Sequence, residues 1–315
     1  MREALSQAEL EALHCWEAED RVPGRPQMTE FRRRLRYQQA RWREAKGYPI
    51  GTQPIVPRPG KPTRLVGSRL PLDYAQERGA NFLTAAVRDA VRARTSFVEP
   101  HQSFDHQRLW ADLLWSPALA FNLFGDLAAD LALADRAVQA WWPDAPGTVS
   151  EVRFAHSPGR FDWAYLGSLR SFDAAFVLDL GDGTQGIVAV DVNYHEHARP
   201  AIAKPIGRPR QREVAARAGV FVEGAIDAVD RTDLLVTSLE HLLLLSMLQH
   251  ESGAWAWGRY VVVHPAGNSD WAGACRRYAD LLTDRSTFSS PTLEELLAPL
   301  PRRLAADLRE RYVAG

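Results

Sequence analysis

The sequence predicts an α/β fold in which a mixed central sheet is flanked by helices, with a helical extension at the N-terminus. Apolar runs typical of buried strands occur at about residues 150–155, 172–180, 185–194 and 259–264. Longer amphipathic or apolar segments typical of helices lie before, between and after them. This order of strands and helices is typical of an α/β core.

The elements can be placed in order along the 315 residues. Charged helical segments separated at Pro23-Gly24-Arg25-Pro26 occupy residues 1–46, and the Pro- and Gly-rich stretch 48–71 indicates an irregular, extended wrap. We predict an N-terminal extension over 1–100 and an α/β core with C-terminal helices over 101–315. The further segments expected to be helical are 84–94, much of 104–142 with a break near Ser116-Pro117, 237–250, 270–282 and 292–312.

The most informative segment consists of two apolar runs on either side of Gly181-Asp182-Gly183. Asp-Gly and Gly supply the positive φ that short turns require, so the triplet predicts a hairpin. If all three residues form the loop, Leu180 faces Thr184. Asp173 then lies opposite Asp191, whereas a two-residue loop would place the two carboxylates on opposite faces. Opposed β carbons lie about 5 Å apart, and a hard cation relieves the repulsion between facing carboxylates.

Polar residues alternate near the end of the second strand. Asp191, Asn193 and His195 would share one face, while Val192 and Tyr194 would face a core. A buried strand has little reason to carry such groups in alternation unless they bind something. A divalent metal is the ligand that this set favours, and the alternative is a polar strand end exposed to water.

These residues resemble the Asp…(Asp/Glu)-x-Lys core of the PD-(D/E)XK nuclease superfamily, and more closely a bacterial family described as restriction-endonuclease-like. Further stretches that resemble that family follow in order over most of the chain, and they are 42–51, 67–71, 79–83, 116–125, 258–262 and 265–268. The resemblance implies a restriction-endonuclease-like core. It also implies hydrolysis of DNA phosphodiester bonds with Mg²⁺ or Mn²⁺.

The resemblance assigns metal-binding roles to three acidic residues. Asp173 and Asp191 would hold the ion. The family places an acidic residue on the preceding strand, which makes Glu151 a candidate third ligand, with a surface strand position as the alternative. Asp126 could instead supply this acid from the preceding helix, and it ranks below Glu151.

Two residues after the motif complete the set of candidate catalytic residues. His195 could act as a general base or contact a DNA phosphate, because its ordinary pKa lies near neutrality. A solvent-exposed strand end is the alternative. Glu196 belongs to the Tyr-His-Glu ending of the family pattern, although we expect it to point to the opposite face and to pair with Arg199.

One position departs from the family pattern. Asn193 stands where the family has a lysine that is thought to orient the attacking water and to stabilise negative charge. An amide can hydrogen-bond a water but carries no charge. Lys204 could swing into the site, with a solvated loop lysine as the simpler alternative. The sequence therefore predicts a Mg²⁺-dependent endonuclease. The alternatives are a weakened or inactive nucleic-acid-binding module and a metal-dependent hydrolase of small molecules.

The charge balance excludes a globally basic protein. Thirty-eight Lys and Arg residues face 39 Asp and Glu residues, a net charge of −1, so contact with nucleic acid must come from a local patch. Arg208, Arg210 and Arg212 follow the motif strand and are the favoured candidates, with a solvated loop as the alternative. The basic run 32–36 is more simply the solvated face of a helix.

The remaining features lead us to expect a cytoplasmic protein. Cys15 and Cys275 lie far apart and predict neither a disulfide framework nor a zinc site. The N-terminus has no apolar segment typical of a signal peptide, and no apolar run approaches the roughly 20 residues of a membrane span. A homodimer is plausible for an enzyme that cuts both DNA strands, but no residue pattern demonstrates one.

Overall fold

A five-stranded mixed sheet forms the centre of the computed structural model, which describes residues 4–60, 62–102 and 104–313. The strands lie in the order β3-β4-β5-β6-β7, with antiparallel pairing from β3 to β5 and parallel pairing from β5 to β7. They are β3 (Thr148–His156), β4 (Phe172–Asp179), β5 (Gln185–Val192), β6 (Trp255–Val263) and β7 (Phe288–Ser289). The predicted α/β class with a mixed central sheet is confirmed.

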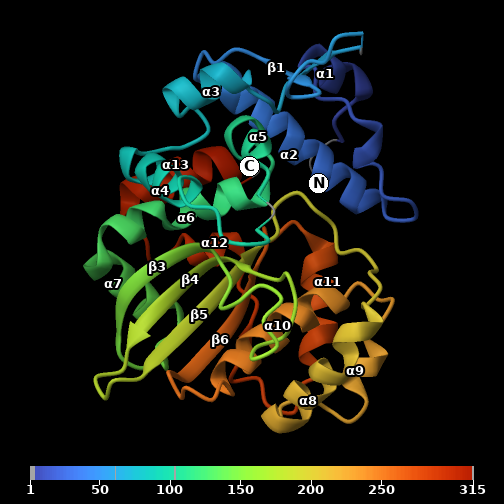
Figure 1. Ribbon diagram of the computed structural model, residues 1–315. Coiled ribbons are helices and arrows are strands. Elements are labelled where there is room, and N and C mark those ends of the chain that lie inside the picture. The colour runs from blue at the N-terminus through green and yellow to red at the C-terminus, as the bar shows by residue number, and fades with distance from the viewer. Residues whose placement is uncertain (1–3, 61, 103, 314–315) are drawn as a thin grey trace.

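Helices cover both faces of this sheet because successive strand residues point to opposite sides. Phe176, Val188 and Val190 belong to one hydrophobic cluster, and Ala175 and Ile187 belong to the other. The first cluster contains residues of α6 (Ser116–Ala129), α7 (Leu131–Trp141), α12 (Leu293–Leu296) and α13 (Arg302–Tyr312). The second contains residues of α8 (Arg208–Ala218), α10 (Leu235–Leu248) and α11 (Ser269–Ala279), and Ile226 of α9 (Ala225–Ala228) packs against it; these helices are grouped on the right of the sheet in Figure 1.

The N-terminal elements lie above the sheet in Figure 1. They are α1 (Gln7–Ala12), η1 (Ala18–Asp20), α2 (Pro26–Ala45), β1 (Gly51–Gln53), β2 (Arg64–Val66), α3 (Leu72–Arg78), α4 (Ala85–Thr95) and α5 (His106–Ala111). Met28, Leu35 and Trp42 of α2 belong to the same hydrophobic cluster as Val190 of β5. The extension therefore packs on the core, while the boundary near residue 100 stays a prediction.

Three segments differ from the sequence-based expectation. The stretch 48–71 contains the antiparallel β1–β2 pair. The arginine-rich run after the motif is helical, because η2 (Pro205–Gly207) leads directly into α8, whose Pro209 lies in the first turn where proline is tolerated. The expected single helix over 292–312 is two helices, since Pro299 and Pro301 interrupt it.

Within the described ranges, no single helix has the length and apolarity needed to cross a membrane. The helices α6 and α7 meet these criteria only as a pair, bent by 119°.

Candidate functional site

The β4–β5 hairpin has the predicted three-residue loop. Gly181 and Gly183 adopt φ values of 80° and 87°, a conformation that glycine adopts without strain. Across the loop, the N–H of Leu180 donates to the carbonyl of Thr184 (3.3 Å). The predicted register, on which the site depends, is therefore confirmed.

The hairpin brings Asp173 and Asp191 together where its strands separate. The ladder extends to Ala174 opposite Val190, and beyond this pair the carboxylates replace backbone partners. The N–H of Asp173 donates to Oδ1 of Asp191 (3.1 Å), and the N–H of Val192 donates to Oδ2 of Asp173 (2.9 Å). Asp191 is only 7% exposed, and its second oxygen, Oδ2, has no hydrogen-bond partner within the part of the chain that the structure describes.

Glu240 of α10 adds a third acidic side chain from the helix layer. Its negative charge is one of the causes that raise the pKa of Asp191. Its Oε2 accepts a hydrogen bond from the hydroxyl of Tyr260 (3.0 Å), and its Oε1 accepts one from Nη1 of Arg170 (3.3 Å). We call Asp173, Asp191 and Glu240 the acid cluster. The sequence-based expectation did not include Glu240, although it is the one acidic residue in the largely apolar segment that forms α10.

The surroundings of the two aspartates disfavour their ionised forms. Burial raises the pKa of Asp173 to about 7, and the negative charges of Glu240 and Glu196 add to this rise. Burial also raises the pKa of Asp191 well above its usual range, with Glu240 and Asp173 as the next causes. A cation between the carboxylates would reverse this tendency, because an opposite charge favours ionisation.

The donors present suit a hard divalent cation only in part. Carboxylate oxygens are its preferred ligands, and the unpartnered Oδ2 of Asp191 is available for one. Among the described residues, however, no three His, Cys, Asp or Glu side chains form a complete metal site. An ion held by Asp173 and Asp191 would therefore take its remaining ligands from water and from a bound phosphate, as Mg²⁺ commonly does.

Glu196 lies near this site because α6 holds it there. Its Oε2 accepts a hydrogen bond of 2.5 Å from Oγ of Ser116, the first residue of α6. The expected pairing of Glu196 with Arg199 is wrong, since Nε of Arg199 donates to Nε2 of His197 (3.2 Å). The negative charge of Glu196 nevertheless contributes to the raised pKa of Asp173.

A cavity gives Asp173 a space for small molecules. It has a volume of about 120 Å³, and Asp173, Ser171, Phe104 and Trp115 are among the residues that line it. This volume suffices for a few water molecules, each of which occupies about 30 Å³ in the liquid. Asp173 is accordingly less buried than Asp191.

The comparisons with known proteins agree with this geometry. A sequence model of the PD-(D/E)XK nuclease superfamily matches residues 26–314. The chain belongs to this superfamily. No curated protein and no solved structure matches the chain.

Asn193 occupies the motif position at which the superfamily pattern has lysine. It follows the last residue of β5, and its N–H donates to the carbonyl of Val263 (2.8 Å). Its side chain is partly exposed and has no hydrogen-bond partner among the described residues. Lys204 does not replace it within the fold, because it is an exposed residue at the start of η2.

Strand alternation led us to expect His195 on the same face as Asp191, but His195 does not join the carboxylate pair. β5 ends at Val192, and His195 is buried, with Nε2 at 3.0 Å from Oδ1 of Asp20. Two hydrogen bonds, of 2.6 and 2.8 Å, join Asp20 to Arg36. Burial lowers the pKa of His195. We call Asp20, Arg32, Arg36 and His195 the balanced cluster, and its two buried arginines correct the expectation of a solvated basic face.

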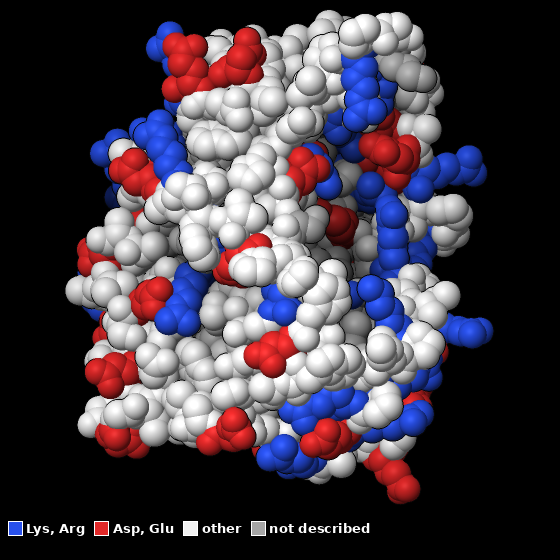
Figure 2. Space-filling view, viewed as in Figure 1, with Lys and Arg blue, Asp and Glu red and all other residues white. Residues whose placement is uncertain are grey.

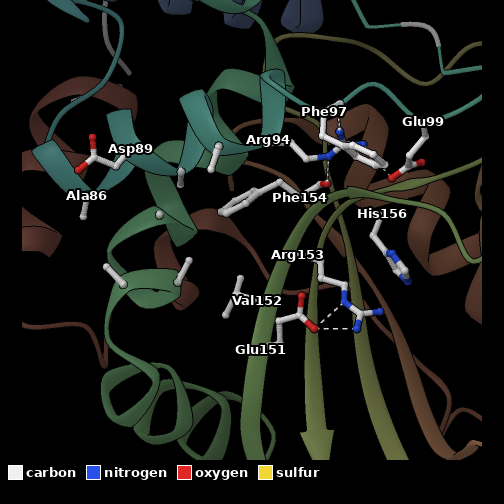
Figure 3. Close-up of a pocket in the computed structure, with 15 residues that line it drawn as sticks. Ala86, Asp89, Arg94, Phe97, Glu99, Glu151, Val152, Arg153, Phe154 and His156 are labelled. Atoms are coloured by element: carbon white, nitrogen blue, oxygen red, sulfur yellow. Dashed lines mark hydrogen bonds and ion pairs between the residues drawn. The ribbon is translucent and has the colours of Figure 1, made fainter.

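Glu151 lies away from the site. It pairs with Val177 in the β3–β4 ladder, four residues along β4 from Asp173, which corresponds to roughly 13 Å. Its exposed carboxylate accepts hydrogen bonds from Nε and Nη2 of Arg153 (2.8 and 2.6 Å). Figure 3 shows this pair at a separate pocket, beneath Arg94 and Phe154. The structure therefore does not support Glu151 as the third carboxylate, because the strand register separates it from the pair.

The predicted DNA-contacting arginines are on α8, and each has partners within the chain. Arg208 pairs with Asp230. Arg210 pairs with Glu213 (2.8 Å) and donates to two backbone carbonyls. Arg212 pairs with Asp227 (2.7 Å), and its side chain is the most exposed of the three at 56%. Contact with DNA would require these pairs to open, which is easiest for the exposed Arg212.

Proposed function

We propose that this member of the superfamily is a metal-dependent nuclease that hydrolyses DNA phosphodiester bonds. Membership of the superfamily supports a nuclease fold. One further observation carries the proposal, namely the buried and unpartnered Oδ2 of Asp191 beside the carboxylate of Asp173. A buried carboxylate oxygen with no donor is costly unless a ligand satisfies it.

Asp173 and Asp191 are the residues that would hold Mg²⁺ or Mn²⁺. Such an ion, when bound, lowers the pKa of a coordinated water and neutralises charge on phosphoryl oxygens. The reciprocal hydrogen bonds with the opposite strand fix both aspartates before any ligand arrives. The free amide of Asn193 would hydrogen-bond the attacking water, although it supplies no charge.

The distribution of charge on the surface leaves DNA contact to local groups. Figure 2 shows Lys and Arg side chains gathered on the right of the view, beside a hollow in the surface. Arg212 is the best candidate contact on α8, while Arg208 and Arg210 are more strongly tied to the fold. DNA would approach a site whose own charge is negative, so the metal ion and basic residues must offset that repulsion.

A second function is favoured by the amide at position 193. Without the motif lysine, the chain could bind nucleic acid through the same fold and hydrolyse it slowly or not at all. In that case replacement of Asn193 by lysine would raise the cleavage rate, because it introduces the missing positive charge.

Incubation of the purified protein with plasmid DNA tests the proposal. Supercoiled plasmid should be nicked or linearised with Mg²⁺ or Mn²⁺, and EDTA should prevent this. The Asp191→Ala variant, prepared in parallel, should show no cleavage, which excludes a contaminating nuclease. Tight DNA binding without cleavage would favour the binding module, and failure to bind any polynucleotide at low salt would contradict both functions.

A further inference from the structure

The acid cluster has few positive charges around it. Asp173, Asp191 and Glu240 lie together, with Glu196 nearby, and the motif residue Asn193 is neutral. Within the described parts of the chain, Arg170 is the one cation that forms an ion pair with the acid cluster. A phosphate drawn to this site would therefore find one guanidinium, that of Arg170, paired with the acid cluster through Glu240.

The fold fixes Arg170 from two directions. Its N–H donates to Oγ of Ser168 (3.3 Å) in the loop just before β4, so the residue lies three positions before Asp173 in the chain. Its Nη1 donates to Oε1 of Glu240 (3.3 Å), while Oε2 of Glu240 accepts from Tyr260 (3.0 Å). Glu240 thereby links Arg170 to the strand next to β5.

Arg170 also keeps donors available for a ligand. A guanidinium has five N–H donors, and the side chain of Arg170 has a hydrogen bond only to Glu240 among the described residues. Its side chain is 35% exposed, whereas that of Glu240 is 12% exposed. A planar guanidinium with free donors can bind two phosphate oxygens at once and remains charged at every working pH.

We propose that Arg170 contacts the phosphate of the bound DNA and supplies the positive charge that Asn193 cannot, with Glu240 as its positioning residue. This inference rests on the proposed nuclease function. It identifies a residue outside the motif as the group that stabilises negative charge during hydrolysis. The ordinary alternative is an ion pair that only holds α10 against the loop before β4.

The test compares Arg170→Ala and Arg170→Lys with the control Arg277→Ala, which removes an arginine of α11 that pairs with Asp233 (2.6 Å). Steady-state cleavage of a short DNA duplex is measured at saturating Mg²⁺. Arg170→Ala should lower kcat by about 10²–10³-fold, the typical effect of removing one donor to a developing charge. Arg170→Lys should retain part of the rate, and Asn193→Lys should restore at least about tenfold in the Arg170→Ala background.

Several results would overturn the inference. One is a cleavage rate of Arg170→Ala like that of the control. Another is an equal loss of cleavage rate in Arg170→Ala and Arg170→Lys, with no recovery of the rate when Asn193→Lys is added to Arg170→Ala. If the wild-type protein cuts no DNA, the nuclease proposal fails by itself. Arg170 is then tested by the affinity for the same duplex in Ca²⁺. At least about fivefold weaker binding by Arg170→Ala than by the control supports the contact, and equal binding contradicts it.

Discussion

Two buried charge clusters lie next to the motif segment, and they differ in how their charges are satisfied. In the balanced cluster, Asp20 has Arg36 at hydrogen-bonding distance and both Arg32 and His195 nearby. In the acid cluster, the carboxylates face each other, and Oδ2 of Asp191 has no partner among the described residues. His195 lies only four positions after Asp191 in the chain.

This difference shows how a structural cluster is distinguished from a ligand site. A buried charge that has an oppositely charged partner within the chain holds elements together, here the N-terminal extension and the segment after β5. A buried charge without pairing is costly until a ligand completes it. Residue type alone does not separate the two cases, since each cluster contains a buried aspartate: Asp191 in β5, and Asp20 beside His195, which follows that strand.

The largest effect on stability is expected from Asp20→Ala. The substitution leaves the guanidinium of Arg36 buried without its main partner, so the free energy of unfolding should fall by about 3–5 kcal/mol. Urea unfolding measures this value. Asp280→Ala, which breaks the exposed pair with Arg285, is the control and should cost less than about 1 kcal/mol. A similar small cost for Asp20→Ala would mean that the balanced cluster does not support the fold.

Asp173 is expected to make the folded protein less stable as the pH rises. Its pKa in the folded protein is about 7, above the value of about 3.9 in an unfolded chain. The folded state therefore binds the additional proton, so this contribution to stability is complete below about pH 4 and is lost as the pH rises towards 7. Melting temperatures of the metal-free protein should show it.

The variant Asp173→Asn isolates this contribution, because the lowered pKa of His195 acts in the opposite direction. Relative to that variant, the wild-type protein should lose melting temperature between about pH 4 and pH 7. If the difference in melting temperature between the wild-type protein and Asp173→Asn did not change over this range, this would contradict the burial of an unpaired carboxylate at position 173.

A smaller effect, and one that increases stability, is expected from Asp191→Asn. The amide removes a buried charge and can still accept the N–H of Asp173 through its oxygen. At about pH 8 without metal, the free energy of unfolding should rise by about 1 kcal/mol, while cleavage is lost. If urea unfolding showed Asp191→Asn to be as destabilising as Asp20→Ala, this would contradict the stated difference between the acid cluster and the balanced cluster.

The smallest effect is expected from Glu151→Gln. This side chain is exposed and pairs with Arg153 far along the sheet from Asp173. The Glu151→Gln variant should cleave DNA at the wild-type rate. Its free energy of unfolding should lie within about 0.5 kcal/mol of the wild-type value, the usual range for surface substitutions. A large loss of cleavage would show that Glu151 reaches the site when DNA binds.

The sequence predicted the parts of the site that depend on local geometry. The loop Gly181-Asp182-Gly183 determines the register, and the register places Asp173 opposite Asp191. Strand alternation correctly placed Val192 in the core, and Tyr194, two residues beyond the end of β5, is buried there as well. The prediction failed at His195, because β5 had already ended and alternation no longer applied.

Long-range packing could not be predicted in this way. Glu240 reaches Asp191 only because α10 packs on the face of the sheet to which the odd-numbered residues of β5 point. Asp20 reaches His195 because the N-terminal extension folds over the end of β5. No spacing in the sequence predicts either contact, and the lone acidic residue in the largely apolar helix α10 is the one sequence feature that marks Glu240.

Calorimetric titration of the metal-free protein with Mn²⁺ tests the central claim most directly. The account predicts that the wild-type protein binds the ion and that Asp173→Asn and Asp191→Asn both lose this binding while remaining folded. Glu151→Gln should bind as the wild type does. Absence of Mn²⁺ binding to the wild-type protein, or equal binding to Asp191→Asn, would contradict the account.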